Sequence, residues 1–181
     1  MGYSSRVFYE NRLLAHGSVA KHQLFADDVP LTFIDTAGCG FEEKVDNTNI
    51  SNTEEAELLF KHLSRLLAEL STHYTASQFP SIAIISPYRE QLSVLKEQLQ
   101  HMPELKTYLN SITVNTIDSL QGQERDIVYI SMTRSNNDGA IGFLSDIRRM
   151  NVAMTRARKK QVIIGDSATL SSHPFYADFV A

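Results

Sequence analysis

The chain has 181 residues, enough for one domain with a sizeable hydrophobic core. Its contents of 43% hydrophobic and 21% charged residues are those of an ordinary soluble globular protein. The net charge of −4 argues against a protein that holds nucleic acid by bulk electrostatics alone.

The sequence gives no sign of a membrane-spanning, disulfide-bonded or metal-binding protein. No apolar run approaches the ~18–20 residues of a membrane span, and no apolar signal region follows Met1. Cys39 is the single cysteine, so no internal disulfide can form, and we expect a cytoplasmic protein without a membrane partner. The histidines are scattered without metal-ligand spacing, at positions 16, 22, 62, 73, 101 and 173.

The first predicted strand is Leu31–Ile34, and it ends at the sequence Asp-Thr-Ala-Gly of residues 35–38. This tetrapeptide is also the switch sequence of small GTPases, whose length the chain matches. A GTPase needs a phosphate-cradling G-x-x-x-x-G-K-[ST] loop and a guanine-specificity motif, and the sequence contains neither. We therefore interpret residues 35–38 as a turn and rank the GTPase hypothesis last.

A polar, acidic stretch over residues 42–52 is predicted to be a surface loop, and a helix follows it. Asn52 or Thr53 can cap this helix, because both offer a side-chain oxygen to the free N–H groups of the first turn. Carboxylates favour the same turn through the helix dipole. The carboxylates are Glu54, Glu55 and Glu57, and the apolar face is formed by Leu58, Leu59, Leu63, Leu66, Leu67 and Leu70.

The next predicted strand is Ile82–Ile85, after which Pro87 ends the strand and opens a helix that runs to about Gln100. The turn carries the sequence SPYREQ of residues 86–91. Taken by itself, this is an ordinary helix-start turn, whose free backbone amides could also meet a phosphate. Two more strands are predicted at 111–114 and 127–130.

Helical periodicity extends from Ser145 to Lys160, with an apolar stripe at positions 147, 150, 154 and 157. On such a helix Arg149 and Arg156 are two turns apart and point the same way. Paired guanidiniums suit phosphate recognition, and a solvated helix with surface ion pairs is the alternative. The last predicted strand is Gln161–Ile164.

Five predicted strands alternate with helices, which indicates an α/β fold with a mostly parallel sheet covered by helices on both faces. In such sheets ligands gather at the carboxyl ends of the strands. The turns at 35–38 and 86–91 and the segment after Val114 all follow strands, so we expect a binding site there.

Two long segments carry a family resemblance. SLQGQERDIVYIS (119–131) and GFLSDIRRMNVAMTRARKKQVIIGD (142–166) resemble motifs V and VI of superfamily 1 helicases. The nearest branch contains the nonsense-mediated-decay RNA helicases and the replication helicase-nucleases. The resemblance implies a RecA-like P-loop NTPase fold without its own P-loop, with residues 1–181 forming a single second, C-terminal motor domain. A first RecA-like domain, absent from this chain, would supply the phosphate loop and most contacts to ATP and Mg²⁺.

The resemblance also implies roles for individual residues. Arg156 corresponds to the catalytic arginine finger, and the nucleotide side of the cleft would include Gly122, Glu124 and Arg149. The single-strand track would include Ser86, Pro87, Tyr88, Thr116, Asp118 and Ser119. No residue is assigned to a metal. The chain departs from the family at Thr53, where some members carry a second arginine for the γ-phosphate.

The expected function is that of a C-terminal motor domain in an ATP-dependent helicase acting on single-stranded DNA or RNA. The isolated chain is expected to hydrolyse ATP negligibly. The alternative is a catalytically inactive RecA-like module that binds nucleic acid or protein. The motifs do not distinguish DNA from RNA, because that distinction depends mainly on contacts to the 2′-hydroxyl.

Overall fold

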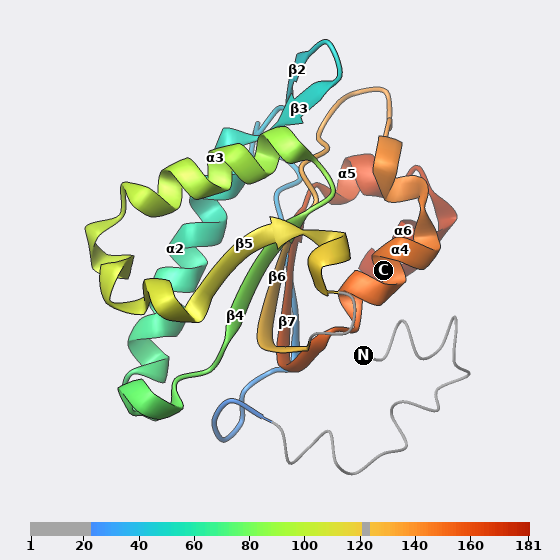
Figure 1. The fold of residues 1–181 in the computed structure, drawn as a ribbon. Coiled ribbons are helices and arrows are strands. Elements are labelled where there is room, and N and C mark those ends of the chain that lie inside the picture. The colour runs from blue at the N-terminus through green and yellow to red at the C-terminus, as the bar shows by residue number, and fades with distance from the viewer. Residues whose placement is uncertain (1–22, 121–123) are drawn as a thin grey trace.

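A five-stranded, fully parallel sheet forms the centre of the computed structural model, which describes residues 23–120 and 124–181 (Figure 1). The strand order is β1-β7-β6-β4-β5. The strands are β1 Leu31–Asp35, β4 Ile82–Ser86, β5 Ile112–Thr116, β6 Arg125–Ser131 and β7 Ala157–Gly165. The predicted α/β class and its five strands are confirmed.

Helices cover both faces of the sheet, as predicted (Figure 1). On one face lie α2 (Thr53–Leu70) and α3 (Arg89–Gln100), and on the other lie α4 (Ile147–Met154), α5 (Ser167–Leu170) and α6 (Pro174–Val180). Successive side chains of β4 alternate between the two cores, because neighbouring residues of a strand point to opposite faces. Short 3₁₀ helices complete the fold: η3 Ala76–Gln78, η4 Pro103–Ser111, η5 Ile117–Leu120 and η6 Gly142–Ser145.

Helix α2 begins where the sequence predicts. Asn52 is the cap, and its side-chain oxygen accepts a hydrogen bond from the backbone N–H of Glu55 at 3.1 Å. Five of the six leucines of the predicted apolar face pack in the core against the sheet, and Leu59, Leu63 and Leu70 are completely buried, whereas Leu58 is only half-buried. The helix is therefore held mainly by this packing.

Residues 42–52 are not simply a loop as predicted, because they contain a two-stranded hairpin. Strand β2 (Lys44–Asp46) pairs antiparallel with β3 (Asn49–Ser51). Asn47 adopts φ +55° in the turn, a conformation that asparagine tolerates better than most residues. The strands are short and largely exposed, so no apolar alternation revealed them.

The predicted helix from Ser145 to Lys160 is wrong over its second half. The Asp146 side chain caps α4 by accepting from the backbone N–H of Arg149 at 3.2 Å, and the helix ends at Met154. Strand β7 already begins at Ala157, and its interior position in the sheet, between β1 and β6, decides the conformation of this segment. Arg149 and Arg156 therefore do not share one helix face.

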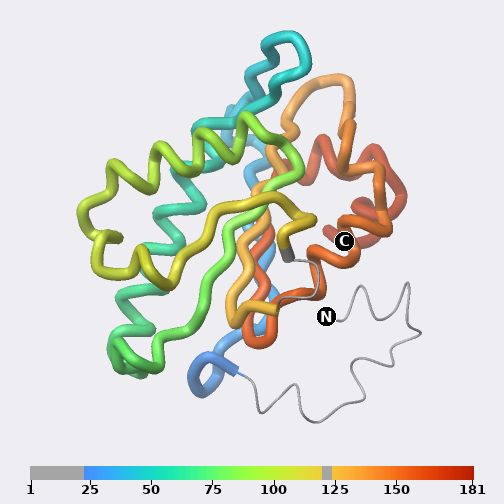
Figure 2. Tube along the Cα trace, viewed as in Figure 1, coloured from blue at the N-terminus to red at the C-terminus, as the bar shows by residue number. Residues whose placement is uncertain are grey.

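The chain's first described strand lies beside its last. Strand β1 pairs in parallel with β7 from Leu31↔Gln161 to Asp35↔Gly165, and Figure 2 shows the two segments side by side. Within the described residues, no helix is long and apolar enough to cross a membrane. The same part of the chain contains no group of three or more His, Cys, Asp or Glu residues suited to hold a metal ion.

Leu63→Ala should lower the free energy of unfolding by about 2–5 kcal/mol, because it leaves a cavity in the α2 core. Leu109→Ala is the control, since that side chain is 41% exposed and its loss should cost only about 0.5 kcal/mol. Urea unfolding followed by circular dichroism measures both. Equal losses for the two variants would show that α2 does not pack as described.

Candidate functional site

The carboxyl ends of the parallel strands form one edge of the sheet, and most of the predicted nucleic-acid residues lie on it. Ser86 ends β4, Thr116 ends the neighbouring β5, and Asp118 and Ser119 follow in η5. Arg149 of α4 also reaches this edge, where its Nε donates to Asp118 Oδ1 at 3.1 Å. The structure thus brings these residues together and adds to them Arg149, which was predicted for the nucleotide.

Ser86 and Tyr88 are buried at this edge and already have partners. The hydroxyls of Ser86 and Thr133 are 3.1 Å apart, and Ser86 Oγ also accepts from the backbone N–H of Tyr88. The Tyr88 hydroxyl donates to the carbonyl oxygen of Ile141 at 2.9 Å. Because the Tyr88 side chain is only 3% exposed, its contribution to any binding surface is to position its neighbours.

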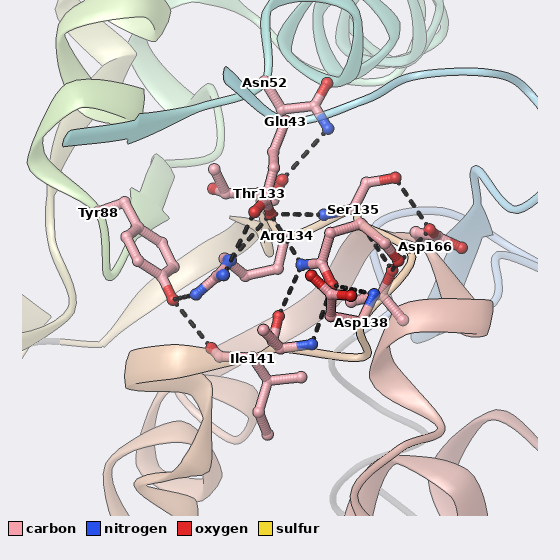
Figure 3. A network of polar contacts seen from close by, with 12 residues as sticks. Glu43, Asn52, Tyr88, Thr133, Arg134, Ser135, Asp138, Ile141 and Asp166 are labelled. Atoms are coloured by element: carbon pink, nitrogen blue, oxygen red, sulfur yellow. Dashed lines mark hydrogen bonds and ion pairs between the residues drawn. The ribbon is translucent and has the colours of Figure 1, made fainter. Parts of the chain in front are cut away.

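A buried ion pair holds Tyr88 in place, and Figure 3 shows it from close by. Arg134 Nε donates to Glu43 Oε2 at 2.8 Å, its Nη2 donates to Glu43 Oε1 at 3.2 Å, and its Nη1 donates to the Tyr88 hydroxyl at 3.1 Å. This bidentate geometry is the strongest form of carboxylate recognition by arginine. Burial raises the pKa of the Tyr88 phenol, although Arg134 acts in the opposite direction, so the hydroxyl remains a neutral donor.

Glu43 also links its own loop to the loop after β6 and, through Ser135, to the loop after β7. Its Oε2 accepts from the backbone N–H of Ser135 at 2.9 Å and from Asn136 Nδ2 at 3.2 Å. Ser135 Oγ in turn donates to Asp166 Oδ2 at 2.9 Å, after the end of β7. We call Glu43, Tyr88, Arg134 and Ser135 the Glu43 cluster. Sequence reasoning missed Glu43 and Arg134, which are 91 positions apart and carry no shared motif.

Glycine is required at one position beside this cluster. Gly142 has φ +52°, and a Cβ built there would lie 2.4 Å from Arg134 Nη1 and 2.6 Å from the Tyr88 hydroxyl. Any side chain would therefore displace the guanidinium or the phenol. The close approach lets the next backbone N–H, that of Phe143, donate to the Tyr88 hydroxyl at 3.1 Å.

A second buried network centres on Glu55. Its Oε1 accepts from Ser131 Oγ at 2.6 Å and from the backbone N–H of Thr133 at 2.8 Å. Gln91 Nε2 donates to Ser131 Oγ at 2.9 Å and to the carbonyl oxygen of Asn52 at 3.0 Å. The network ties the start of α2 and the first turn of α3 to the end of β6. It also fixes Thr133 at φ +73°, a costly conformation for a β-branched residue.

Burial raises the pKa of Glu55 to about 7, while the two hydrogen bonds it accepts act in the opposite direction. Its second oxygen, Oε2, is buried without a hydrogen-bond partner among the described residues. An ionised carboxylate with one unsolvated oxygen is costly to bury, which agrees with a group that is protonated over much of the acidic range.

The predicted nucleotide residues lie elsewhere, at the amino ends of β6 and β7. Arg125 pairs in register with Ala157, so the residues just before them, Glu124 and Arg156, are neighbours at this edge. Arg156 Nε is buried and has no hydrogen-bond partner within the described residues. Gly122 lies outside the described residues. Glu124 and Arg156 thus lie just before neighbouring strands at this edge, whereas Arg149 lies at the opposite edge.

Three surface grooves lie around the carboxyl edge. One, of about 440 Å³, has Pro87, Arg89, Phe143 and Arg149 among its lining residues. Its neighbour, of about 520 Å³, shares Arg149 and adds Arg148. The third, of about 510 Å³, is acidic, and its carboxylates are Glu42, Glu43, Asp138 and Asp166. The two grooves on the side of β4 and β5 thus hold arginines beside the carboxylates of Glu90, Asp118 and Asp146, whereas the charged residues that line the third are all carboxylates.

The parallel sheet, its helix-covered faces and the polar groups at its carboxyl edge define a RecA-like α/β domain. Comparison with known proteins defines the family. Residues 1–168 match the family described as an AAA domain. The chain belongs to this family and to the superfamily 1 helicases, which the sequence motifs had indicated.

Curated relatives match over nearly the whole chain. DNA-binding protein SMUBP-2 of Rattus norvegicus is 36% identical over 98% of this chain and 18% of its own length. DNA polymerase alpha-associated DNA helicase A of Saccharomyces cerevisiae is 34% identical over 94% of this chain and 26% of its own length. Helicase sen1 of Schizosaccharomyces pombe is 32% identical over 98% of this chain and 10% of its own length. The chain therefore spans about a quarter or less of these relatives.

Glu55→Gln should remove a pH dependence of stability. Between pH 4.5, the ordinary pKa, and about 7, the folded chain binds more protons than the unfolded chain, so the free energy of unfolding falls as the pH rises. Glutamine keeps the shape and stays neutral, and the wild type should lose up to about 3 kcal/mol relative to the variant between pH 4.5 and 8.

Denaturant unfolding at several pH values measures this difference. Glu54→Gln is the matched control, because Glu54 is an exposed carboxylate in the same first turn of α2. Parallel pH profiles for wild type and Glu55→Gln would mean that Glu55 is ionised in the folded chain.

Proposed function

We propose that this chain is the C-terminal motor domain of an ATP-dependent superfamily 1 helicase that acts on single-stranded DNA or RNA. The observation that carries this is the register of β6 and β7, in which Arg125 pairs with Ala157. It places Glu124 and Arg156 just before these partners at the amino edge, within the two motifs that resemble those of helicases. Family membership supports it, as do the relatives' names, which include a DNA-binding protein and a DNA helicase.

Arg156 is proposed as the arginine finger. The residue is half-buried at the amino edge, so part of its side chain remains accessible to an acceptor from another molecule. ATP bound with Mg²⁺ to a first RecA-like domain would supply that acceptor, the γ-phosphoryl group. Arginine suits this task because it stays charged and forms planar, bidentate hydrogen bonds to phosphate oxygens. Gly122 and Glu124 are proposed to complete the nucleotide side.

The carboxyl edge of β4 and β5 is proposed as the single-strand track. Ser86 and Tyr88 are buried there, so direct contact falls to their neighbours, including the half-buried Pro87, Thr116 and Ser119. Asp118 holds Arg149, and we propose that Arg149 serves this track instead of the nucleotide. Two grooves that share Arg149 support this assignment, because phosphate contacts position a strand.

A binding module without turnover is the second candidate. The acidic groove beside the Glu43 cluster favours it, because four carboxylates line it and no Lys or Arg is among its described lining residues. Such a groove suits a basic protein segment better than a nucleic acid.

Arg156→Ala should reduce nucleic-acid-stimulated ATP hydrolysis by about 10³-fold or more in a protein that joins this domain to a phosphate-loop domain. Loss of the guanidinium removes the charge that offsets the developing negative charge on the phosphoryl oxygens. Steady-state ATPase assays with single-stranded DNA and then RNA measure the effect.

Arg158→Ala provides the control, because this neighbouring arginine of β7 is exposed and pairs with Asp126 of β6 at 3.3 Å. The 181-residue chain alone should hydrolyse ATP negligibly. Retention of the rate by Arg156→Ala in the joined protein would contradict the finger and favour the binding module.

A further inference from the structure

Phe143 is an apolar side chain in an unusual setting. Its side chain is 60% exposed, although it lies between buried residues of the core, Ile141 and Leu144. Exposing a large aromatic ring forfeits about 1.5–3 kcal/mol of burial. A single exposed residue needs no explanation by itself. What distinguishes Phe143 is the number of buried polar groups that hold its backbone.

The Glu43 cluster fixes where Phe143 lies. The Tyr88 hydroxyl accepts from the backbone N–H of Phe143 and from Arg134, and it donates to the carbonyl of Ile141, so its hydrogen-bonding capacity is used around this one turn. The Phe143 and Tyr88 rings also touch, with centroids 5.4 Å apart and planes at 45°. Burying the Arg134–Glu43 ion pair costs free energy. Here the pair holds Tyr88, which in turn fixes the backbone of the exposed Phe143.

The surroundings of Phe143 match one kind of ligand. It lines the groove of about 440 Å³, together with the apolar Ile50 and Pro87. Arg89 and Arg149 also line this groove, beside the carboxylate of Glu90, and Arg149 is paired with Asp118 at the groove's border. An aromatic face in a groove that also presents guanidiniums suits a nucleotide, whose base stacks while its phosphates pair with arginine.

We propose that Phe143 is a stacking platform for one base of a single-stranded nucleic acid, with Arg89 and Arg149 on the flanking phosphates. Tyr88 and Arg134 are positioning residues that hold the ring in place. The inference rests on the proposed function, because it assigns a base contact to the same single-strand track. It adds that binding depends on bases as well as on the phosphate backbone, without selecting a sequence.

The test compares two oligonucleotides of equal length, one of oligothymidylate and one with the same phosphates but abasic sugars. Fluorescence anisotropy with the full 181-residue chain gives the affinity for each. Wild type should bind the base-bearing strand about 5- to 100-fold more tightly, and Phe143→Ala should lose that preference while retaining its affinity for the abasic strand. Phe143→Trp should retain the preference, since its ring also stacks.

Two further variants separate stacking from general damage. Val29→Ala truncates another exposed apolar side chain, 57% exposed and outside this groove, and should leave the preference intact. Tyr88→Phe keeps the buried ring but removes the hydroxyl that anchors Phe143, so it should reduce the preference in part. Circular dichroism of each variant checks that it is folded.

If Phe143→Ala kept the preference for the base-bearing strand, the stacking role of Phe143 would be contradicted. The proposed function as a helicase motor domain would not be affected. Equal binding of both strands by wild type would overturn it too, and would point to a protein partner for the ring. If wild type bound neither strand, both the platform and the nucleic-acid part of the proposed function would fail. As a second measurement, ultraviolet cross-linking of a 5-iodouracil strand should attach to the peptide that contains Phe143.

Discussion

The buried carboxyl of Glu55 is the interaction on which the carboxyl edge of this domain depends. It joins the first turn of α2 to the last residues of β6, and through Ser131 it reaches Gln91 of α3. Because Thr133 is fixed there in a left-handed conformation, the chain turns abruptly after β6 and directs Arg134 toward Glu43. The Glu43 cluster can form only where this turn exists.

The two edges of the sheet have different chemistry, and α4 lies between them. Its first turn carries Arg149, which meets Asp118 at the carboxyl edge, and it ends two residues before Arg156 at the amino edge. Eight helical residues span about 12 Å. A sequence pattern that merges α4 with β7 therefore places on one helix face two arginines that the fold separates, which is why the predicted pairing of Arg149 and Arg156 was wrong.

Much of this fold could be read from the sequence because its signals are local. Runs such as Ile82–Ile85 are apolar throughout, as interior parallel strands must be, and Asn52 before three glutamates is an ordinary helix start. The start of β7 was missed because Arg158 and Lys159 are polar and Ala157 continued the helical period by chance. The roles of Glu43, Arg134 and Phe143 depend on contacts between distant segments, which no local pattern contains.

The strand order also determines when β1 can enter the sheet during synthesis. Strand β7 lies between β1 and β6, so β1 has no partner in the sheet until residues 157–165 have been synthesised. At about 5–20 residues per second, the ribosome needs roughly 6–26 seconds to travel from the end of β1 to the end of β7. During that time the apolar residues of β1 are unpaired, and a nascent chain of this kind is a natural client for chaperones. Of the described strands, β7 is made last, and it joins β1 to the rest of the sheet.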